Sequence, residues 1–306
     1  MSLSDDVRGE LAAIEPRRAC CRLAELSALV RCAGTVHLRG SGRVGAHLEL
    51  ASPAVARRAF SLLRSYGVPC EIRTFRQQAF DRATRFQLHL DEDARALQIL
   101  NEAGVLDATL APLEEPPRRV VSRSCCRAAY LRGALLASGS VSGPPSAHLE
   151  IRSVSFEGAV FLAVLAQAEA IPLATLDRGR HAIAYAKGVE AIAELLAFLG
   201  AQEAALRLGE RAVVSATRGR ANRLANADHA NLRRASSAAG AQLRAIRRLE
   251  QRGLFTGLTP ELREIAELRR RNPTLPLAEL AARCRPPATR SAAQRRLAKL
   301  RRLADL

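Results

Sequence analysis

Two segments of this 306-residue chain share one seventeen-residue pattern, and this duplication constrains the fold more than any other feature. Residues 20–36 read CCRLAELSALVRCAGTV and residues 125–141 read CCRAAYLRGALLASGSV, aligned without a gap at an offset of 105 positions. Seven of the seventeen positions are identical: two Cys, then Arg, Ala, Leu, Gly and Val. The segment HLEL at 47–50 is answered by HLEI at 148–151. The sequence therefore contains an internal duplication of one domain, and we expect two similar halves related by an approximate twofold axis.

Hydrophobic periodicity predicts the same order of elements in each copy. In the first copy we expect a helix over 20–32, strands over 35–38 and 46–50 around the turn SGRVG, a helix starting near Ser52 and Pro53, strands over 71–73 and 86–90, and a helix over 91–103. In the second copy we expect helices over 125–137, 156–169 and 188–199, and a strand over 181–185. The predicted unit is αββαββα, and the fold class is α+β.

The first helix of each copy carries small residues at near-helical spacing. These are Ala28 and Ala33 in the first copy, and Gly133 and Ser138 in the second, each followed by a glycine. Small side chains let two helices approach closely. We therefore expect these two helices to pack against each other at the centre of the duplicated region.

The positive charge of the chain is concentrated at its end. The whole chain has 47 basic and 30 acidic residues. Residues 218–306 carry 21 basic and 7 acidic side chains, a net charge of +14, whereas residues 1–217 carry +3. A concentrated positive field attracts polyanions, and nucleic acid is the leading candidate.

Residues 218–251 form a polar, basic run. The sequence predicts an amphipathic helix in its second part, with apolar positions at Leu232, Ala235, Ala239, Leu243, Ile246 and Leu249. Its first part is rich in asparagine, and two interpretations of Asn222, Asn226 and Asn231 stay open: helix caps, or contacts with DNA.

The last 46 residues have the pattern of a helix-turn-helix. We expect a helix over 261–271 that ends at Asn272 and Pro273, a short helix over 277–283, a tight turn, and a third helix over 289–303 with Thr289 as its N-cap. The apolar positions of the third helix are Ala293, Leu297, Leu300 and Leu303. Its opposite face, around Ala298, offers Arg and Gln side chains that can pair with base edges in a major groove.

The predicted DNA contacts fall into two groups. Residues expected to face base edges are Arg290, Ser291, Gln294 and Arg295, and residues expected to reach phosphates are Arg296, Lys299, Arg301 and Arg302. The full predicted DNA-binding set adds Thr289, Asn222, Arg223, Asn226 and Asn231.

The seven cysteines predict no metal or redox chemistry. They include the adjacent pairs at 20–21 and 125–126, but no two cysteines have the CxxC spacing of a zinc knuckle. We interpret them as reduced, mostly buried thiols. The acidic N-terminus is neither a secretory signal nor a transit peptide, and the most apolar stretch, 159–176, is interrupted by Gln167, Glu169 and Pro172, which argues against a membrane span.

The duplicated helices resemble the LAGLIDADG motif of homing endonucleases. In that family the acidic residue just before the last glycine binds the metal ion that cleaves DNA. The matching positions here are Ala33 and Ser138. Neither side chain can supply the hard oxygen ligands that Mg²⁺ requires, so the sequence predicts no catalytic residues, no metal, no cofactor and no nuclease activity.

Over nearly its whole length the chain is similar to the WhiA family, transcription regulators of sporulation and cell division. The similarity rests on SLSDDVRGELAAI, the two duplicated segments, AYAKGVEAI, NRLANADHAN and LAELAARCRPPATRSAAQRRLAKL. It implies two LAGLIDADG-like repeats, 1–115 and 116–217, a basic helical linker, 218–258, and an all-α helix-turn-helix domain, 259–306.

The resemblance also implies a function. The expected ligand is double-stranded promoter DNA, and the expected location is the cytoplasm, at the nucleoid. Candidate protein partners are RNA polymerase and a WhiB-like iron–sulfur regulator, the latter implied for family members in sporulating actinobacteria.

Two other functions compete with transcription regulation. A working homing endonuclease would need acids from elsewhere, and the available ones are Asp5, Asp6, Glu25 and Glu150. An RNA-binding or ribosome-associated module is compatible with a basic tail, but the chain has only three Tyr and eight Phe for stacking on unpaired bases.

Overall fold

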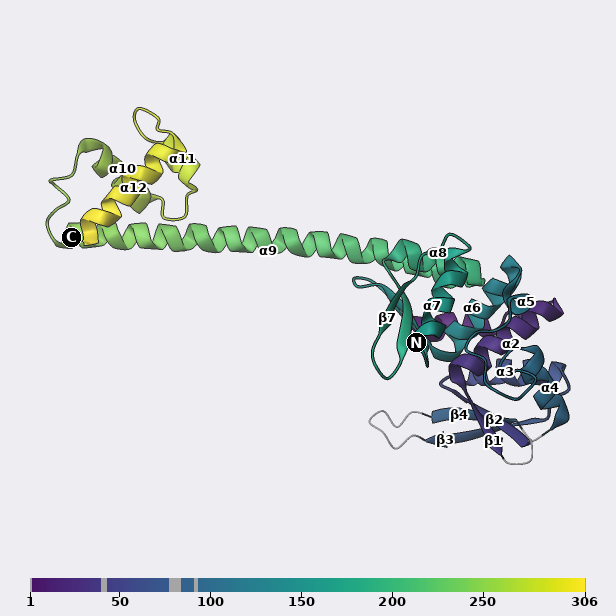
Figure 1. The fold of residues 1–306 in the computed structure, drawn as a ribbon. Helices are drawn as coiled ribbons and strands as arrows, with labels where there is room; N and C mark the ends of the chain where they lie inside the picture. The colour runs from purple at the N-terminus through teal and green to yellow at the C-terminus, as the bar shows by residue number, and fades with distance from the viewer. Residues whose placement is uncertain (1, 40–42, 77–83, 91–92, 306) are drawn as a thin grey trace. The chain divides into compact units, whose positions relative to one another are not determined.

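A computed structural model describes residues 2–39, 43–76, 84–90 and 93–305 (Figure 1). The chain divides into two compact units, Met1–Ala216 and Thr217–Leu306. The helices are α1 (Leu3–Ala12), α2 (Ala19–Ala33), α3 (Pro53–Ser65), α4 (Ala94–Glu102), α5 (Arg118–Val121), α6 (Ser124–Ser138), α7 (Phe156–Gln167), α8 (Val189–Leu199), α9 (Gln202–Gln251), α10 (Pro260–Arg271), α11 (Leu277–Ala282) and α12 (Arg290–Asp305). The strands are β1 (Gly34–Arg39), β2 (Arg43–Leu50), β3 (Cys70–Arg76), β4 (Thr84–Leu90), β5 (Gly139–Ser142), β6 (His148–Ser153), β7 (Ala174–Asp177) and β8 (Ala182–Lys187).

The predicted duplication is confirmed in the first unit. Its two copies run α2-β1-β2-α3-β3-β4-α4 and α6-β5-β6-α7-β7-β8-α8, and each contains a four-stranded antiparallel sheet. The strand orders, β1-β2-β4-β3 and β5-β6-β8-β7, are equivalent. The strand β7 of the second copy was not predicted; it is short, with four mostly exposed residues, and pairs with β8.

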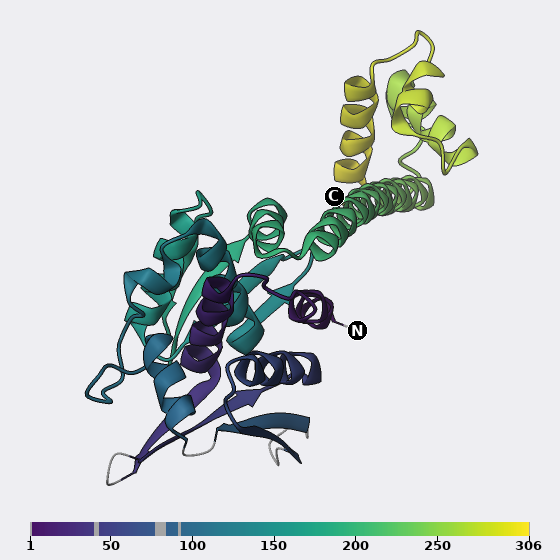
Figure 2. The same cartoon turned by 90° about the vertical axis from the view of Figure 1, so that its right-hand side faces the viewer.

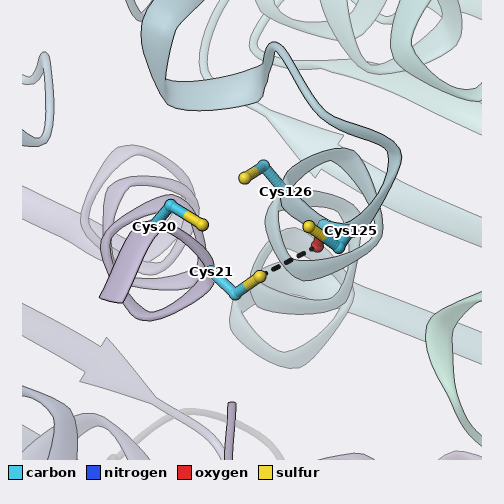
Figure 3. A group of neighbouring side chains, drawn as sticks. All are labelled: Cys20, Cys21, Cys125 and Cys126. Atoms are coloured by element: carbon cyan, nitrogen blue, oxygen red, sulfur yellow. Dashed lines mark hydrogen bonds between the residues drawn. The ribbon is translucent and has the colours of Figure 1, made fainter. Parts of the chain in front are cut away.

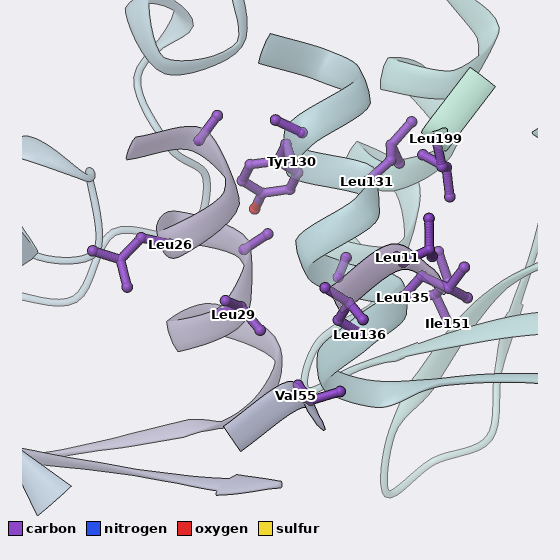
Figure 4. Packing of buried hydrophobic residues seen from close by; sticks show 14 of the residues in the cluster. Leu11, Leu26, Leu29, Val55, Tyr130, Leu131, Leu135, Leu136, Ile151 and Leu199 are labelled. Carbon is purple, nitrogen blue, oxygen red and sulfur yellow. The ribbon is translucent and has the colours of Figure 1, made fainter. Parts of the chain in front are cut away.

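The two first helices, α2 and α6, pack side by side at the centre of this unit (Figures 1 and 2). Leu26 and Leu29 of α2 and Leu131 and Leu135 of α6 are fully buried in one continuous apolar core (Figure 4). That core reaches from α1 to the start of α9, with aliphatic side chains supplying most of its volume. The predicted close helix pair is therefore confirmed.

Gly133 lies where α6 comes closest to α2. A Cβ atom at this position would lie 2.4 Å from the main-chain oxygen of Glu25 and 3.1 Å from the Cβ of Ala28. No larger residue fits without a shift of one helix, because the nearest obstacle is main chain. The small residues predicted at Ala28 and Gly133 thus do meet across the helix pair.

A buried ion network crosses the same interface. The carboxylate of Glu25 is fully buried and accepts hydrogen bonds from Arg58 Nε at 2.7 Å and from Arg132 Nε and Nη2 at 2.9 and 2.6 Å. Arg132 also donates to the carbonyl oxygen of Leu199 at 3.3 Å. The network joins α2 and α3 of one copy to α6 and α8 of the other, so it ties together the two halves.

Helix α1, which was not predicted from the sequence, also links the two copies: it packs against α3 of the first copy and against β5 and α6 of the second. The Ser4 hydroxyl donates to the carbonyl oxygen of Val141 at 2.8 Å and accepts from its N–H at 2.7 Å, and Arg8 donates to the carbonyl oxygen of Gly139 at 2.7 Å. These bonds satisfy β5, which is an edge strand and would otherwise expose unpaired main-chain groups. The Glu10 carboxylate accepts from the N–H groups of Glu203 and Ala204, at the positively polarised N-terminus of α9.

The second unit has a separate core. It is formed by the end of α9 together with α10, α11 and α12, and includes Ile246, Leu249, Ile265, Leu280 and Leu297. Helix α9 is continuous from Gln202 to Gln251, so the region expected to be a linker begins inside a helix. In the described part of the chain, no helix is both long and apolar enough to cross a bilayer.

Candidate nucleic-acid interface

The third helix of the helix-turn-helix, α12, starts at a side-chain cap. The hydroxyl of Thr289 accepts a hydrogen bond from the N–H of Ala292 at 3.2 Å, which confirms the predicted N-cap. Ala293, Leu297, Leu300 and Ala304 are buried against α10 and α11 at the three- and four-residue spacing of a helix. Leu303, also predicted on this face, is half-buried and packs against the same core, and Ala304 is buried next to it.

The opposite side of α12 is open to solvent. Its exposed residues are Arg290, Ser291, Gln294, Arg295, Ala298, Lys299, Arg301 and Arg302. Ser291, Arg295, Ala298 and Arg302 follow one another at spacings of four, three and four, so they form one stripe along the helix. The small side chain of Ala298 lies near the middle of this stripe. We call these eight residues the basic face of α12.

The cations of the basic face have no counterions within the described part of the unit. The structure contains no ion pair or hydrogen bond from the side chains of Arg290, Arg295, Lys299, Arg301 or Arg302 to any described residue. Elsewhere in the unit arginines are paired: Arg270 with Glu250 at 2.8 Å, and Arg248 with Asp305 at 3.1 Å. The basic face therefore presents uncompensated positive charge, together with the polar side chains of Ser291 and Gln294.

Arg296 differs from the other predicted phosphate contacts. Its side chain is half-buried, and its guanidinium lies close enough to the Cys284 thiol and to Glu261 to act on the pKa of both groups. Burial raises the pKa of the Cys284 thiol, and Arg296 acts in the opposite direction. These contacts orient Arg296 toward the protein. A role in positioning the turn before α12 fits its surroundings better than a phosphate contact.

The asparagine-rich run lies within α9. Asn222, Asn226 and Asn231 are exposed and interior to the helix, so their interpretation as helix caps is wrong. Asn222 and Asn226, one turn apart, lie on one side of the helix with Arg223 adjacent, and Asn231 accepts a hydrogen bond from Arg234 at 3.1 Å. The predicted apolar stripe is correct only in its second part, because Leu232 and Ala235 are exposed and the burial begins at Ala239.

Ala33 and Ser138, the positions that match the metal-binding acids of the LAGLIDADG motif, lie at the C-terminal ends of α2 and α6. Ala33 carries no ligand atom, and the Ser138 hydroxyl donates to the main-chain oxygen of Arg152 at 2.6 Å. Cys32 precedes Ala33 and is half-buried, and burial raises the pKa of its thiol to about 11.

The acids that could have served a nuclease from elsewhere are already engaged. Asp5 forms a capping box with Ser2, and Asp6 lies 3.6 Å from Arg211. Glu25 is enclosed by Arg58 and Arg132, and Glu150 contacts His148 at 3.3 Å and Arg178 at 3.8 Å. None of these four carboxylates lies at the end of the duplicated helices.

The outer faces of the two sheets carry mixed charge. Because Leu48 and Leu50 point into the core, the alternate residues His47 and Glu49 face outward, and in the second copy Glu150 and Arg152 do the same. Carboxylates and cations alternate on these faces, with Glu71 and Arg73 paired at 2.9 Å. The described residues of these faces therefore combine both signs of charge, whereas the exposed charges of α12 up to Arg302 are all positive.

Tertiary structure brings together four cysteines that the sequence analysis treated separately. Cys20 and Cys21 begin α2, Cys125 and Cys126 begin α6, and all four sulfur atoms lie within 4.8 Å of one another. The absence of CxxC spacing concealed this group because its members come from two copies of the repeat. The duplication of the CC pair was the available signal.

Three regions of the chain match described families. Residues 19–106 match the WhiA N-terminal LAGLIDADG-like domain, residues 127–218 the WhiA LAGLIDADG-like domain, and residues 221–304 the WhiA C-terminal HTH domain. Curated relatives are similar over the full length. Two proteins named "Probable cell division protein WhiA" are each 35% identical, one from Heliobacterium modesticaldum, covering 100% of this chain and 96% of the relative, and one from Symbiobacterium thermophilum, covering 100% and 98%.

Solved structures agree on the fold. The crystal structure of full-length WhiA from Thermatoga maritima matches with a TM-score of 0.58 and 22% identity, covering 100% of this chain and 98% of that one. A structure of the N-terminal LAGLIDADG domain of WhiA matches with a TM-score of 0.51 and 17% identity, covering 64% and 89%. With its duplicated LAGLIDADG-like region and its C-terminal helix-turn-helix, the chain belongs to the WhiA family.

Proposed function

We propose that this protein is a sequence-specific, non-enzymatic DNA-binding regulator of transcription, acting in cell division and sporulation, whose basic face on α12 reads the major groove of promoter DNA. The observation that carries this proposal is the row of exposed cations on α12 without counterions in the described unit. The relatives named as cell division proteins support the biological setting.

The chemistry of the face supports readout as well as attraction. Arg can donate two hydrogen bonds to guanine, and Gln can pair with adenine, each contact discriminating by about 1–3 kcal/mol. Gln294 and Arg295 lie in the first half of α12, the end at which helix-turn-helix proteins contact bases. Arg290, Ser291 and Thr289 complete the proposed base-facing end, while Lys299, Arg301 and Arg302 would bind phosphates, which fix position without reading sequence.

A second row of contacts is proposed along α9. Asn222, Arg223 and Asn226 are exposed on a helix whose main chain is already satisfied, so their side chains are available to a phosphate backbone. Asn231 is already engaged with Arg234, which makes its contribution the smaller one. RNA polymerase and a WhiB-like iron–sulfur regulator remain the proposed protein partners, and the nucleoid the proposed location.

Loss of nuclease activity follows from the residues at the helix ends. A metal nuclease must hold its ion with hard oxygen ligands, and Ala33 and Ser138 offer one hydroxyl that is already bonded to main chain. A plasmid-nicking assay with Mg²⁺ tests this part of the proposal. Nicking that disappears on removal of Mg²⁺ would restore the endonuclease hypothesis.

The decisive experiment compares binding-site preference among variants of the full chain. Promoter fragments are selected from random DNA with the wild type and with Gln294→Ala and Arg295→Ala. We expect both variants to lose preference at their own base positions, with a loss of about 1–3 kcal/mol per contact. Arg302→Ala should instead weaken binding to all sequences and reduce the slope of log K against log salt by about 0.9.

Arg64→Ala is the matched control, because Arg64 is an exposed arginine of α3 in the first unit. It removes one positive charge and should leave both preference and salt slope unchanged. If Gln294→Ala and Arg295→Ala retain the wild-type motif, α12 does not read the bases.

A further inference from the structure

The four cysteines at the start of α2 and α6 form one compact group (Figure 3). Each helix contributes an adjacent pair, and the two pairs are equivalent positions of the repeat. Cys20 and Cys125 are half-buried, whereas Cys21 and Cys126 are buried, and all four thiols are free. The group lies at the opposite ends of the helices from Ala33 and Ser138, so it is separate from the lost nuclease site.

The spacing of the sulfur atoms suits a tetrahedral metal ion. Zn²⁺ bound to four thiolates at about 2.3 Å requires sulfur atoms about 3.8 Å apart. The four sulfur atoms lie within 4.8 Å of one another, so small rotations of the side chains would close the set around an ion. Within the described ranges of the chain, no other group of three or more Cys, His, Asp or Glu side chains meets the same geometric requirement.

The helix ends favour the negative charge that a metal–thiolate group carries. Four thiolates around a divalent ion have a net charge of −2. Neither α2 nor α6 has a side-chain N-cap, so N–H groups in the first turn of each helix have no capping side chain. Both positively polarised helix ends lie at the sulfur atoms, and Arg18 Nη1 is 3.6 Å from the Cys125 sulfur.

We propose that Cys20, Cys21, Cys125 and Cys126 bind one thiophilic divalent cation of the Zn²⁺ type in a tetrahedral Cys₄ site that joins the two copies of the repeat. The ion would link the N-terminal ends of α2 and α6, whereas the strands β1 and β5 follow their C-terminal ends. The proposal is independent of DNA binding by α12, and its role is structural because four protein ligands leave no open position.

The test begins with the reduced full-length protein, stripped of metal with a chelator. Addition of Co²⁺ should produce the intense visible absorption of a tetrahedral thiolate complex, saturating at one ion per chain, and Zn²⁺ should displace it. The doubly substituted Cys21→Ser, Cys126→Ser chain should lose this spectrum. Cys70→Ser, which changes a half-buried cysteine outside the group, should retain it.

Two further measurements keep the test decisive if the double variant does not fold. In the wild type, bound Zn²⁺ should protect four of the seven thiols from alkylation, and excess Zn²⁺ should raise the melting temperature. Weak octahedral Co²⁺ absorption, a stoichiometry well below one, or no protection would overturn the proposal. A reduced chain that binds no metal but forms a disulfide between the two CC pairs in air would replace it with a redox function.

Discussion

At the scale of single residues, the carboxylate of Glu25 is a buried charge that holds two arginines. It lies in the core with Arg58 and Arg132 around it. The equivalent position in the second copy is Tyr130, so the repeat is asymmetric at this point. Spacing alone could not predict the network, because its members come from three helices that are distant in sequence.

Removal of the Glu25 carboxylate should be strongly destabilising. Glu25→Ala leaves two guanidinium groups buried without their anion, and breaking such a network costs about 3–5 kcal/mol. All three tyrosines, Tyr66, Tyr130 and Tyr185, lie in the first unit and the chain has no Trp, so tyrosine fluorescence during urea unfolding follows that unit. Glu15→Ala, at an exposed position, is the control. Equal unfolding free energies for the two variants would contradict the assignment.

Three histidines stack on the outer face of the first sheet. The rings of His37 and His47 are 4.9 Å apart, those of His47 and His89 are 5.8 Å apart, and His37 Nε2 is 2.8 Å from His47 Nδ1. Burial lowers the pKa of His47, and the neighbouring His37 lowers it further, while Glu49 acts in the opposite direction. The folded state therefore binds the His47 proton less readily than the unfolded state does.

The unfolding free energy of the first unit should consequently decrease as the pH is lowered, and part of this decrease should come from His47. The contribution is fully present above the unfolded pKa of about 6.5 and is lost as pH falls through the lower folded pKa. The difference in unfolding free energy between wild type and His47→Asn should shrink as pH is lowered from about 7.5 to about 5. His229→Asn, an exposed position of α9, should show no such change. A pH-independent difference for His47→Asn would refute this explanation.

At the scale of elements, the α2–α6 pair determines the first unit. The duplicated segment predicted both helices within one residue of their bounds, and small residues predicted their close approach. Their exact contact, Gly133 against the main chain at Glu25, required the structure. Helix α9 was harder to predict. Asn222, Asn226 and Asn231 suggested helix caps, but the Ala, Arg and Leu residues around them favour a continuous helix.

Gly133→Ala should separate the helix pair. The added methyl group must displace main chain, and overpacking of this kind costs about 1–3 kcal/mol. Gly209→Ala provides the matched control, because Gly209 is also helical but a Cβ there has nothing within 4 Å. It should stabilise the chain by about 0.5–1 kcal/mol through helix propensity. Urea unfolding measures both, and a stabilising Gly133→Ala would show that the helices are not in close contact.

At the scale of the whole molecule, the two units differ in core and in charge. The core of the first unit ends at Leu208 and that of the second begins at Ala245, and the net charge beyond residue 217 is +14 against +3 before it. Separate cores suggest that each unit can fold without the other. The proposed division of labour is that the second unit selects DNA, while the first is a platform for a protein partner.

Division of the chain tests this assignment. Fragments 1–216 and 217–306 are checked for folding by circular dichroism and then used in the same site-selection assay as the full chain. We expect 217–306 to retain the sequence preference with steep salt dependence, and 1–216 to show none. Promoter selection by 1–216 alone would move readout to the duplicated region and contradict the proposal for α12.

The sequence by itself determined the repeated αββαββα unit, the helix-turn-helix with its Thr289 cap, and the uneven charge, because periodicity, turn residues and composition are local properties. Only the tertiary structure decided which distant residues meet: Glu25 with Arg58 and Arg132, the four cysteines of two helix ends, and Arg296 with the protein rather than the solvent. The physical reason is that such contacts depend on how helices are placed by the packing of the whole core, and no spacing along the chain records that placement.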